Sequence, residues 1–299
     1  MTASGESGTV TAPGSRWEFE AIGTRWQIDT AAPLEPGMRA EVAAEIDVFD
    51  RAWSRFRPDA AIRELVREGS IPASPDGALM LDLYAELSDA TQGGVNPLIG
   101  DALSRRGYDA SYGFVDRGAR PAPSDWRQRL SWNDGAIVLR TPALIDVGAL
   151  GKGRLVDRVL ELLTARVAGA VTVDAGGDIA LRGSETIALE HPFDATRAIG
   201  VWTITDAALC ASATQRRAWP AADGSGLHHV LDARTGEPVR TIAATWAVAA
   251  DAMTADAATT ALFFDGGPRF AHTHDVAWVR MTTDGRVEWS PDSKAELFS

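Results

Sequence analysis

Four segments of the chain carry acids, hydroxyls, glycines and a histidine where a plain core would carry apolar residues. In residues 254–262, Asp256 and Thr260 are four positions apart, so on a helix both side chains project from one face. A carboxylate and a hydroxyl placed in this way are two hard oxygen ligands, which suit Mg²⁺ rather than Zn²⁺. The alternative is structural, with Asp256 as an acid near a helix N-terminus and Thr260 as a hydroxyl bonded back to its own helix.

Two glycine-rich segments have the composition of phosphate-binding turns. Residues 145–153 (IDVGALGKG) lead directly into a predicted helix, and residues 174–178 (DAGGD) lie between two predicted strands. Glycines before a helix let the backbone approach an anion, whose charge the exposed amides and the helix dipole stabilise. The first segment matches neither the dinucleotide fingerprint nor the P-loop. A plain strand-to-helix turn and a plain hairpin turn therefore remain the alternatives.

The fourth segment, residues 228–238, places a histidine, an acid, an arginine and a Thr-Gly turn within eight residues of one another. Histidine is the side chain best suited to proton transfer near neutral pH. A lone histidine in an exposed loop is usually inert, so this one is a candidate base only because of its neighbours.

The composition narrows the classes of partner and site. The 299 residues carry a formal net charge of −12, which weighs against a nucleic-acid partner because phosphate backbones attract basic surfaces. Cys210 is the single cysteine, so an internal disulfide is impossible, and the five histidines do not form a zinc-like cluster. The sequence has no apolar run of membrane-spanning length. Because its N-terminus lacks the pattern of a secretory signal, we expect a cytoplasmic protein.

Hydrophobic periodicity predicts the elements that position these segments. Helices are expected over residues 38–56, around residues 79–87 and from Lys152, with a strand pair over 17–30, strands at 137–140, 171–173 and 186–190, and a C-terminal hairpin around Asp284 and Gly285. Hairpins imply antiparallel pairing, and strands and helices alternate irregularly, so the fold class is α+β. Residues 1–15 are rich in Gly, Ser and Thr, which predicts a disordered leader before a domain at 16–299.

Taken in order, these segments resemble the motifs of the FAD:protein FMN transferase family, also called the ApbE family. The resemblance covers residues 20–267, and its motifs match Ile22-Gly23-Thr24, Trp53-Ser54-Arg55-Phe56, Gly94-Val95-Asn96-Pro97, residues 146–153, Gly176-Gly177-Asp178, residues 229–236 and residues 255–260. Each motif is weak by itself, but seven in the family's order make a strong resemblance.

The resemblance implies a fold, a metal and a reaction. The fold would be T-fold-like, with FAD in a cleft between two lobes of one domain at 16–299. Mg²⁺ would be bound by Asp256, Thr260 and the backbone carbonyl of Gly151. Family members split FAD, release AMP and attach FMN to a Ser or Thr of a partner protein, often an electron-transfer subunit. His229 matches the histidine thought to take the proton from that hydroxyl, so His229 and Asp256 are the expected catalytic residues.

The resemblance also implies a set of residues close to FAD, which comes from the strand turn, the two glycine-rich segments, the arginine pair and the Thr-Gly turn. These residues are Gly23, Thr24, Asp146, Lys152, Gly176, Gly177, Asp178, Arg217, Thr235 and Gly236.

Several positions depart from the family pattern. The family's Met is Ile22 here, the aspartate of its Gly-x-Phe-Asp-Pro turn is Asn96, and the proline of Asp-Pro-Arg is Ala233. The usual Ser-Gly-Asp reads Ser212-Ala213-Thr214. None of these changes affects Asp256, Thr260, Asp146 or His229.

The alternatives to a transferase are a Mg²⁺-dependent FAD pyrophosphatase that uses water and an FAD-binding protein without catalysis.

Overall fold

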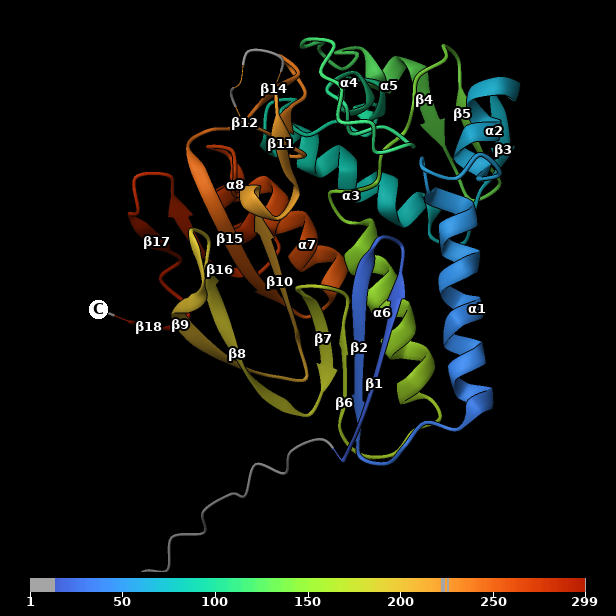
Figure 1. Ribbon diagram of the computed structural model, residues 1–299. Helices are drawn as coiled ribbons and strands as arrows, with labels where there is room; N and C mark the ends of the chain where they lie inside the picture. The colour runs from blue at the N-terminus through green and yellow to red at the C-terminus, as the bar shows by residue number, and fades with distance from the viewer. Residues whose placement is uncertain (1–13, 222–223, 225, 299) are drawn as a thin grey trace, which may run out of the picture.

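The centre of the fold is an eight-stranded sheet in which all neighbouring strands are antiparallel (Figure 1). The structure is a computed structural model that describes residues 14–221, 224 and 226–298, with the backbone alone for Arg216 and Arg217. In spatial order the strands are β1 (Ser15–Ala21), β2 (Thr24–Thr30), β6 (Val171–Asp174), β7 (Asp178–Arg182), β10 (Ala208–Ala213), β15 (Ile242–Ala249), β16 (Ala277–Thr282) and β17 (Val287–Trp289).

Helices cover one face of this sheet. Helix α6 (Gly151–Thr164) packs on β6 and β7, helix α7 (Ala252–Ala261) packs on β10 and β15, and α1 (Pro36–Trp53) packs on the outside of α6 (Figure 1). Because side chains alternate across a strand, Ala208 and Cys210 of β10 join the core beneath these helices. The other helices are α2 (Ala61–Glu68), α3 (Gly77–Ala90), α4 (Gly100–Arg105), α5 (Trp126–Arg129) and α8 (Gly267–Thr273).

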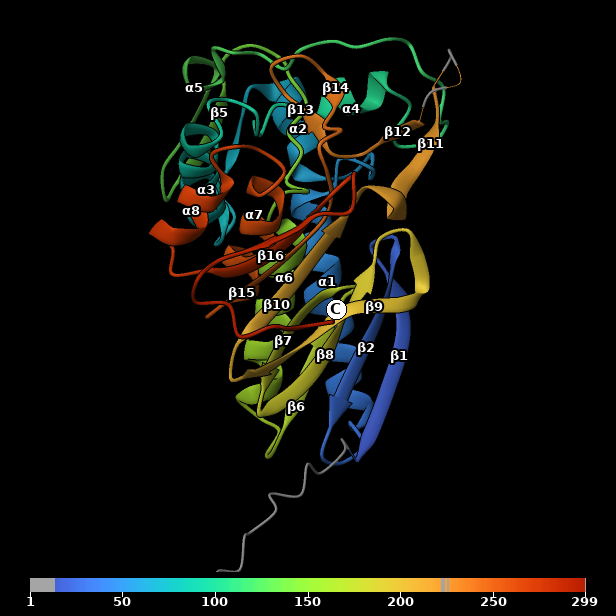
Figure 2. The same cartoon turned by 90° about the vertical axis from the view of Figure 1, so that its left-hand side faces the viewer.

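The opposite face of the sheet packs against a three-stranded sheet made of β8 (Ser184–His191), β9 (Asp194–Thr205) and β18 (Glu296–Leu297) (Figure 2). Leu209 and Trp246 of the large sheet meet Leu189 and Trp202 of the small one in a second apolar core. The remaining elements are β3 (Ser70–Pro72), β4 (Leu130–Trp132), β5 (Ala136–Leu139), β11 (Ala218–Pro220), β12 (Gly226–His228), β13 (Leu231–Asp232), β14 (Glu237–Pro238) and the 3₁₀ turn η1 (Thr214–Arg217).

The predicted α+β class is confirmed, as are the strand pair, the three helices and the C-terminal hairpin. The end of the first helix was placed too late, because α1 stops at Trp53 and the backbone at Ser54 is extended. This early exit turns Arg55 inward to a buried ion pair with Asp146. The predicted leader overlaps β1, which begins at Ser15, and residues 1–13 lie outside the described residues.

Within the described residues, no helix combines the length and apolar character needed to cross a membrane.

Helices α6 and α7 approach each other closely at Gly153. A Cβ atom at this position would lie 2.1 Å from the carbonyl oxygen of Ala252 and 2.8 Å from Cβ of Asp256. The absent side chain also lets the Gly153 amide donate a hydrogen bond to Oδ2 of Asp256, at 3.0 Å. The glycine is therefore required by the packing of the two helices.

We expect Gly153→Ala to lower the free energy of unfolding by about 1–3 kcal/mol, because the new methyl group must push the backbone of α7 away. The measurement is urea unfolding followed by circular dichroism. Gly37→Ala in α1 is the matched control, since a Cβ there meets nothing within 4 Å and alanine favours the helix. Equal stability of Gly153→Ala and Gly37→Ala would contradict the close helix contact.

Candidate active site

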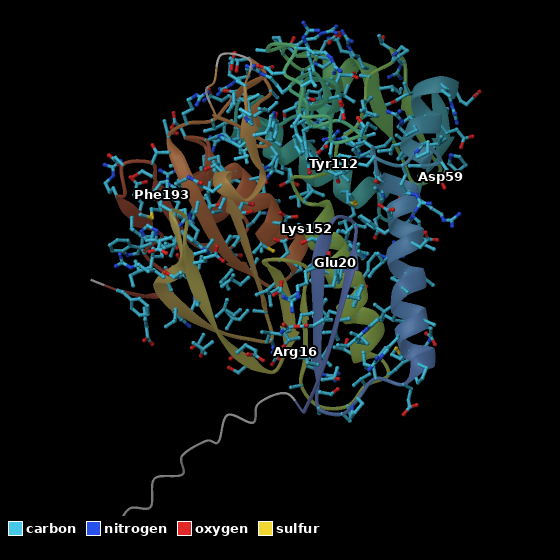
Figure 3. The ribbon with its side chains drawn as sticks, in the orientation of Figure 1. Arg16, Glu20, Asp59, Tyr112, Lys152 and Phe193 are labelled. Atoms are coloured by element: carbon cyan, nitrogen blue, oxygen red, sulfur yellow. The ribbon has the colours of Figure 1, made fainter. Side chains whose placement is uncertain are left out.

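A cleft of about 390 Å³ gathers most of the predicted site residues. One part of its wall is formed by the β1–β2 turn, the loop before α6, the β6–β7 turn, the end of β10, the segment after β12 and one face of α7. The rest comes from residues 94–108 together with Phe56, Tyr84 and Phe264. The predicted residues that line it are Gly23, Thr24, Asp146, Lys152, Gly176, His229, Asp256 and Thr260. Segments far apart in the sequence thus meet at one site, and Figure 3 shows Lys152 near the middle of the molecule.

Other predicted residues do not line this cleft. They are Gly151, Gly177, Asp178, Thr235 and Gly236. Asp178 still reaches the site through a direct ion pair with Lys152. The side chain of Arg217 lies outside the described residues.

Helix α7 presents Asp256 and Thr260 to the cleft on one face, as their spacing predicts. The Thr260 hydroxyl lies 3.3 Å from the carbonyl oxygen of Ala149, and Ala149 itself lines the cleft. The carbonyl group beside Thr260 is therefore that of Ala149, two residues before Gly151. A carboxylate, a hydroxyl and a carbonyl oxygen together form a hard donor set.

The N-terminus of α7 is held by two aspartates, which fixes the position of this face. Asp251 accepts a hydrogen bond from the Thr254 amide at 2.8 Å, as an N-cap does. Asp157 of α6 accepts from the amides of Ala252 and Met253 at 2.7 and 2.9 Å. The first-turn amides of α7 therefore tie it directly to α6.

Lys152, Asp178 and Asp256 form a buried charge cluster. Burial opposes the charge of Lys152, but the carboxylates of Asp178 and Asp256 outweigh it and raise the lysine pKa. Burial first, and the charge of Asp178 second, raise the pKa of Asp256. The Oδ1 atom of Asp178 is buried and has no hydrogen-bond partner among the described residues. Two carboxylates share one ammonium group, so a further cation would stabilise the cluster.

The described residues hold no group of three or more His, Cys, Asp and Glu side chains that could bind a metal ion. A cation at this site would therefore need the neutral oxygens of Thr260 and Ala149 and oxygens from a bound substrate. Mg²⁺ is commonly bound in this way, through one or two carboxylates together with substrate phosphates.

The loop between Asp146 and Ala149 is positioned by two side chains. Arg55 pairs with the Asp146 carboxylate and donates to the Tyr108 carbonyl at 2.7 Å. The Tyr84 hydroxyl donates to the Asp146 carbonyl at 3.0 Å and accepts from the Ala149 amide at 3.1 Å. The sequence indicates Arg55 only as part of a motif. It does not indicate Tyr84 as a site residue, because the position of Tyr84 in its helix is that of a core residue.

The Gly176-Gly177 turn joins β6 to β7 with both glycines at positive φ, 71° and 104°. Asp174 accepts from the Gly177 amide at 2.8 Å. A Cβ on Gly176 would lie 2.2 Å from the Thr24 hydroxyl, so this glycine allows the turn to touch β2. The turn places Gly176 on the cleft wall and starts β7 at Asp178.

The two adjacent histidines face different surroundings. His229 is half-buried and lines the cleft, with its ring centroid 6.4 Å from that of Tyr108. His228 is only 9% exposed; its Nε2 lies 2.9 Å from the Val239 carbonyl, and its Nδ1 accepts from the Val230 amide. Burial lowers the pKa of His228 to about 4. The ring is neutral at pH 7, with the proton on Nε2, and its role is structural.

The Thr235-Gly236 turn packs away from the cleft. Gly236 has φ of 74°, and a Cβ there would lie 2.2 Å from the Arg120 carbonyl oxygen. The Gly236 carbonyl accepts from Arg106 at 3.1 Å. Nearby, Arg234 forms an ion pair with Asp232 at 2.6 Å. These contacts give the turn a packing role, and its contact with FAD stays a prediction.

Solved structures share this fold. The ApbE protein of Thermotoga maritima superposes with a TM-score of 0.78 and 19% sequence identity, covering 93% of this chain and 97% of that one. The apo flavinyl transferase ApbE of Pseudomonas stutzeri superposes with a TM-score of 0.76 and 18% sequence identity, covering 93% of this chain and 94% of that one. The architecture is therefore that of the ApbE flavin transferases.

The sequence also matches the ApbE family over residues 22–279, and the protein belongs to that family. A Klebsiella pneumoniae FAD:protein FMN transferase is 33% identical over 131 residues, which are 43% of this chain and 41% of the relative. A Rhodobacter capsulatus FAD:protein FMN transferase is 25% identical over 315 residues, covering 97% of this chain and 59% of the relative. The chain thus spans less than two thirds of the length of these two relatives.

We expect His228 to make the free energy of unfolding depend on pH between 6.5 and 4. Its pKa is about 4 in the folded state and 6.5 in the unfolded state, so the unfolded state binds more protons in this window. Lowering the pH should therefore remove stability, by about 3 kcal/mol at most for this group. Urea unfolding of the wild type and His228→Gln at pH 4.5–7.5 should show a shallower slope in the variant. Parallel slopes would contradict the buried neutral ring.

Proposed function

We propose that the protein is a Mg²⁺-dependent FAD:protein FMN transferase. It cleaves the pyrophosphate of FAD, attaches FMN through a phosphoester bond to a Ser or Thr hydroxyl of an acceptor protein, and releases AMP. The observation that carries the proposal is a shared cleft. It is lined by Lys152, Asp256, Thr260 and His229. Family membership and the names of the relatives support the same reaction.

Asp256 and Thr260 are the proposed protein ligands of Mg²⁺. The Gly151 carbonyl was the expected third ligand, but the contact of Thr260 with the Ala149 carbonyl favours Ala149 for this role. The shortage of positive charge around Asp178 and Asp256 supports a cation here. When bound, Mg²⁺ polarises the pyrophosphate and offsets the charge that develops on the leaving AMP.

The side chains of the cleft perform the remaining tasks. Lys152 supplies a fixed positive charge to the phosphates, and its pairing with Asp178 holds the ammonium group in place. His229 takes the proton of the acceptor hydroxyl, whose oxygen forms a bond to the FMN phosphorus as the bond from that phosphorus to the oxygen of AMP breaks. A hydroxyl is a poor nucleophile near pH 7 without such a base.

Two other activities share this cleft. An FAD pyrophosphatase would use water in place of the acceptor hydroxyl, and an FAD-binding protein would perform no cleavage. Release of AMP from FAD on addition of Mg²⁺ separates catalysis from binding. Appearance of FMN on an acceptor separates transfer from hydrolysis.

We expect Asp256→Ala to lower the rate of AMP release by about 10²-fold or more, because a charged metal ligand is lost. High Mg²⁺ concentrations should restore part of the rate, and the Mg²⁺-dependent rise in melting temperature should weaken. Asp292→Ala changes an exposed aspartate and is the matched control. Near-normal turnover and Mg²⁺ response in Asp256→Ala would rule out the proposed metal site.

We expect His229→Ala to slow FMN transfer by about 10²- to 10⁴-fold, the usual contribution of a positioned general base. FAD and Mg²⁺ should still bind, which titration of flavin fluorescence can measure. His228→Ala is the neighbouring control, because His228 faces the Val239 carbonyl and not the cleft. An equal loss of transfer in the two variants, after correction for folded protein, would mean that the base lies elsewhere.

A further inference from the structure

A second cavity, which we call the side groove, adjoins the cleft. It has a volume of about 310 Å³ and lies between the tip of the β8–β9 hairpin, at residues 190–195, and the ends of β10 and β15. Ala211, Ser212 and Ala213 of β10 line both the groove and the cleft. Figure 3 shows Phe193, at the hairpin tip, to one side of Lys152. The groove is therefore a lateral extension of the active site.

One edge of β10 is open where it forms this shared wall. Strand β7 pairs with β10 only at residues 208–210, although β10 continues to Ala213. The last contact is the Ala211 amide, which donates to the Gly177 carbonyl at 2.9 Å. Among the described residues, no strand continues the pairing beside Ser212 and Ala213 on that edge. An exposed strand edge of this kind can pair with an extended peptide.

The lining of the groove suits a peptide better than a phosphate. Phe193 is 48% exposed and packs edge-on against His191, which gives the hairpin tip an apolar surface. The charged side chains among the described lining residues are those of Glu190 and Asp194. Hydrogen bonds from Thr196 lower the pKa of Asp194, so its negative charge persists at neutral pH. The Asp194 carboxylate does not suit the phosphates of FAD, because like charges repel.

The cavity on the other side of the cleft offers cations and unused N–H donors. It has a volume of about 270 Å³, and its charged lining residues are Arg55, Arg57, Lys152, Asp50 and Asp146, with Arg55 paired to Asp146 and Arg57 to Asp50. One terminal nitrogen of Arg55 and the indole nitrogen of Trp53 are buried there without a hydrogen-bond partner among the described residues. Cations and unused N–H donors suit a negatively charged nucleotide. The unused N–H donors of Arg55 and Trp53 therefore favour the nucleotide on this side and leave the side groove for the second substrate.

We propose that the side groove binds the acceptor protein as an extended segment that pairs with the edge of β10 at Ser212 and Ala213. An apolar side chain of the segment would lie against Phe193, and the target Ser or Thr hydroxyl would enter the cleft toward His229. This assignment rests on the proposed transferase function and adds the recognition surface for its protein substrate.

The test uses a library of synthetic peptides, each with one threonine, incubated with the full chain, FAD and Mg²⁺. We expect some peptides to gain FMN, and Phe193→Ser to raise the KM of the best peptide about tenfold or more, while KM for FAD stays unchanged. Phe298→Ser is the control, because Phe298 is 60% exposed and lies outside the groove. A benzophenone amino acid at position 193, but not at 298, should also crosslink the peptide.

The outcomes separate this inference from the proposed function. An unchanged peptide KM in Phe193→Ser without a crosslink at 193, or an equal rise of the KM for FAD, would overturn the groove assignment alone. A library in which no peptide is modified would overturn recognition of an extended segment, even if a folded acceptor still gains FMN. If the wild type transfers FMN to neither peptides nor folded acceptors, the proposed function and the groove assignment both fail.

Discussion

Helices α6 and α7 touch at Gly153, where the absence of a side chain brings the backbone of one helix against the carbonyl of Ala252 in the other. This contact lets the Gly153 amide bind the Asp256 carboxylate. It also brings Lys152, at the start of α6, close enough to Asp256 for their charges to shift each other's pKa. Strand β7 lies beneath α6, so Asp178 at its start pairs with Lys152. The arrangement of the charge cluster thus depends on one backbone-to-backbone contact.

The charge balance of this cluster links the fold to the reaction. Buried carboxylates are costly unless they are paired, and here one ammonium group serves two of them. A divalent cation and the phosphates of a substrate would balance each other in the same space. The surrounding network fixes the neutral oxygens as well, because Tyr84 and Arg55 hold the loop that ends at Ala149. Cation, substrate and protein ligands would therefore assemble together.

The sequence was sufficient to predict the α+β class, and eight of the residues that it indicates line one cleft, because the glycine turns and the Asp256–Thr260 spacing are local features. It could not predict α7 as a helix from periodicity, since its alanines are buried around most of its surface. It gives no sign that the Thr235-Gly236 turn packs against Arg106 and Arg120, and the contact of this turn with FAD stays a prediction. Contacts between distant segments, such as Arg55 with Asp146, have no local signal. The carbonyl group that lies beside Thr260 belongs to Ala149 and not to Gly151, which depends on how the loop before α6 meets α7.

We propose that the chain moves FMN from FAD to a protein hydroxyl. The most direct test of this proposal is intact-mass spectrometry of a purified acceptor protein after incubation with the wild-type chain, FAD and Mg²⁺, together with quantification of AMP. We expect the acceptor mass to increase by one FMN less one water, on a single Ser or Thr, with one AMP released for each FMN attached. Release of AMP with free FMN and an unmodified acceptor would contradict the proposal and would favour hydrolysis.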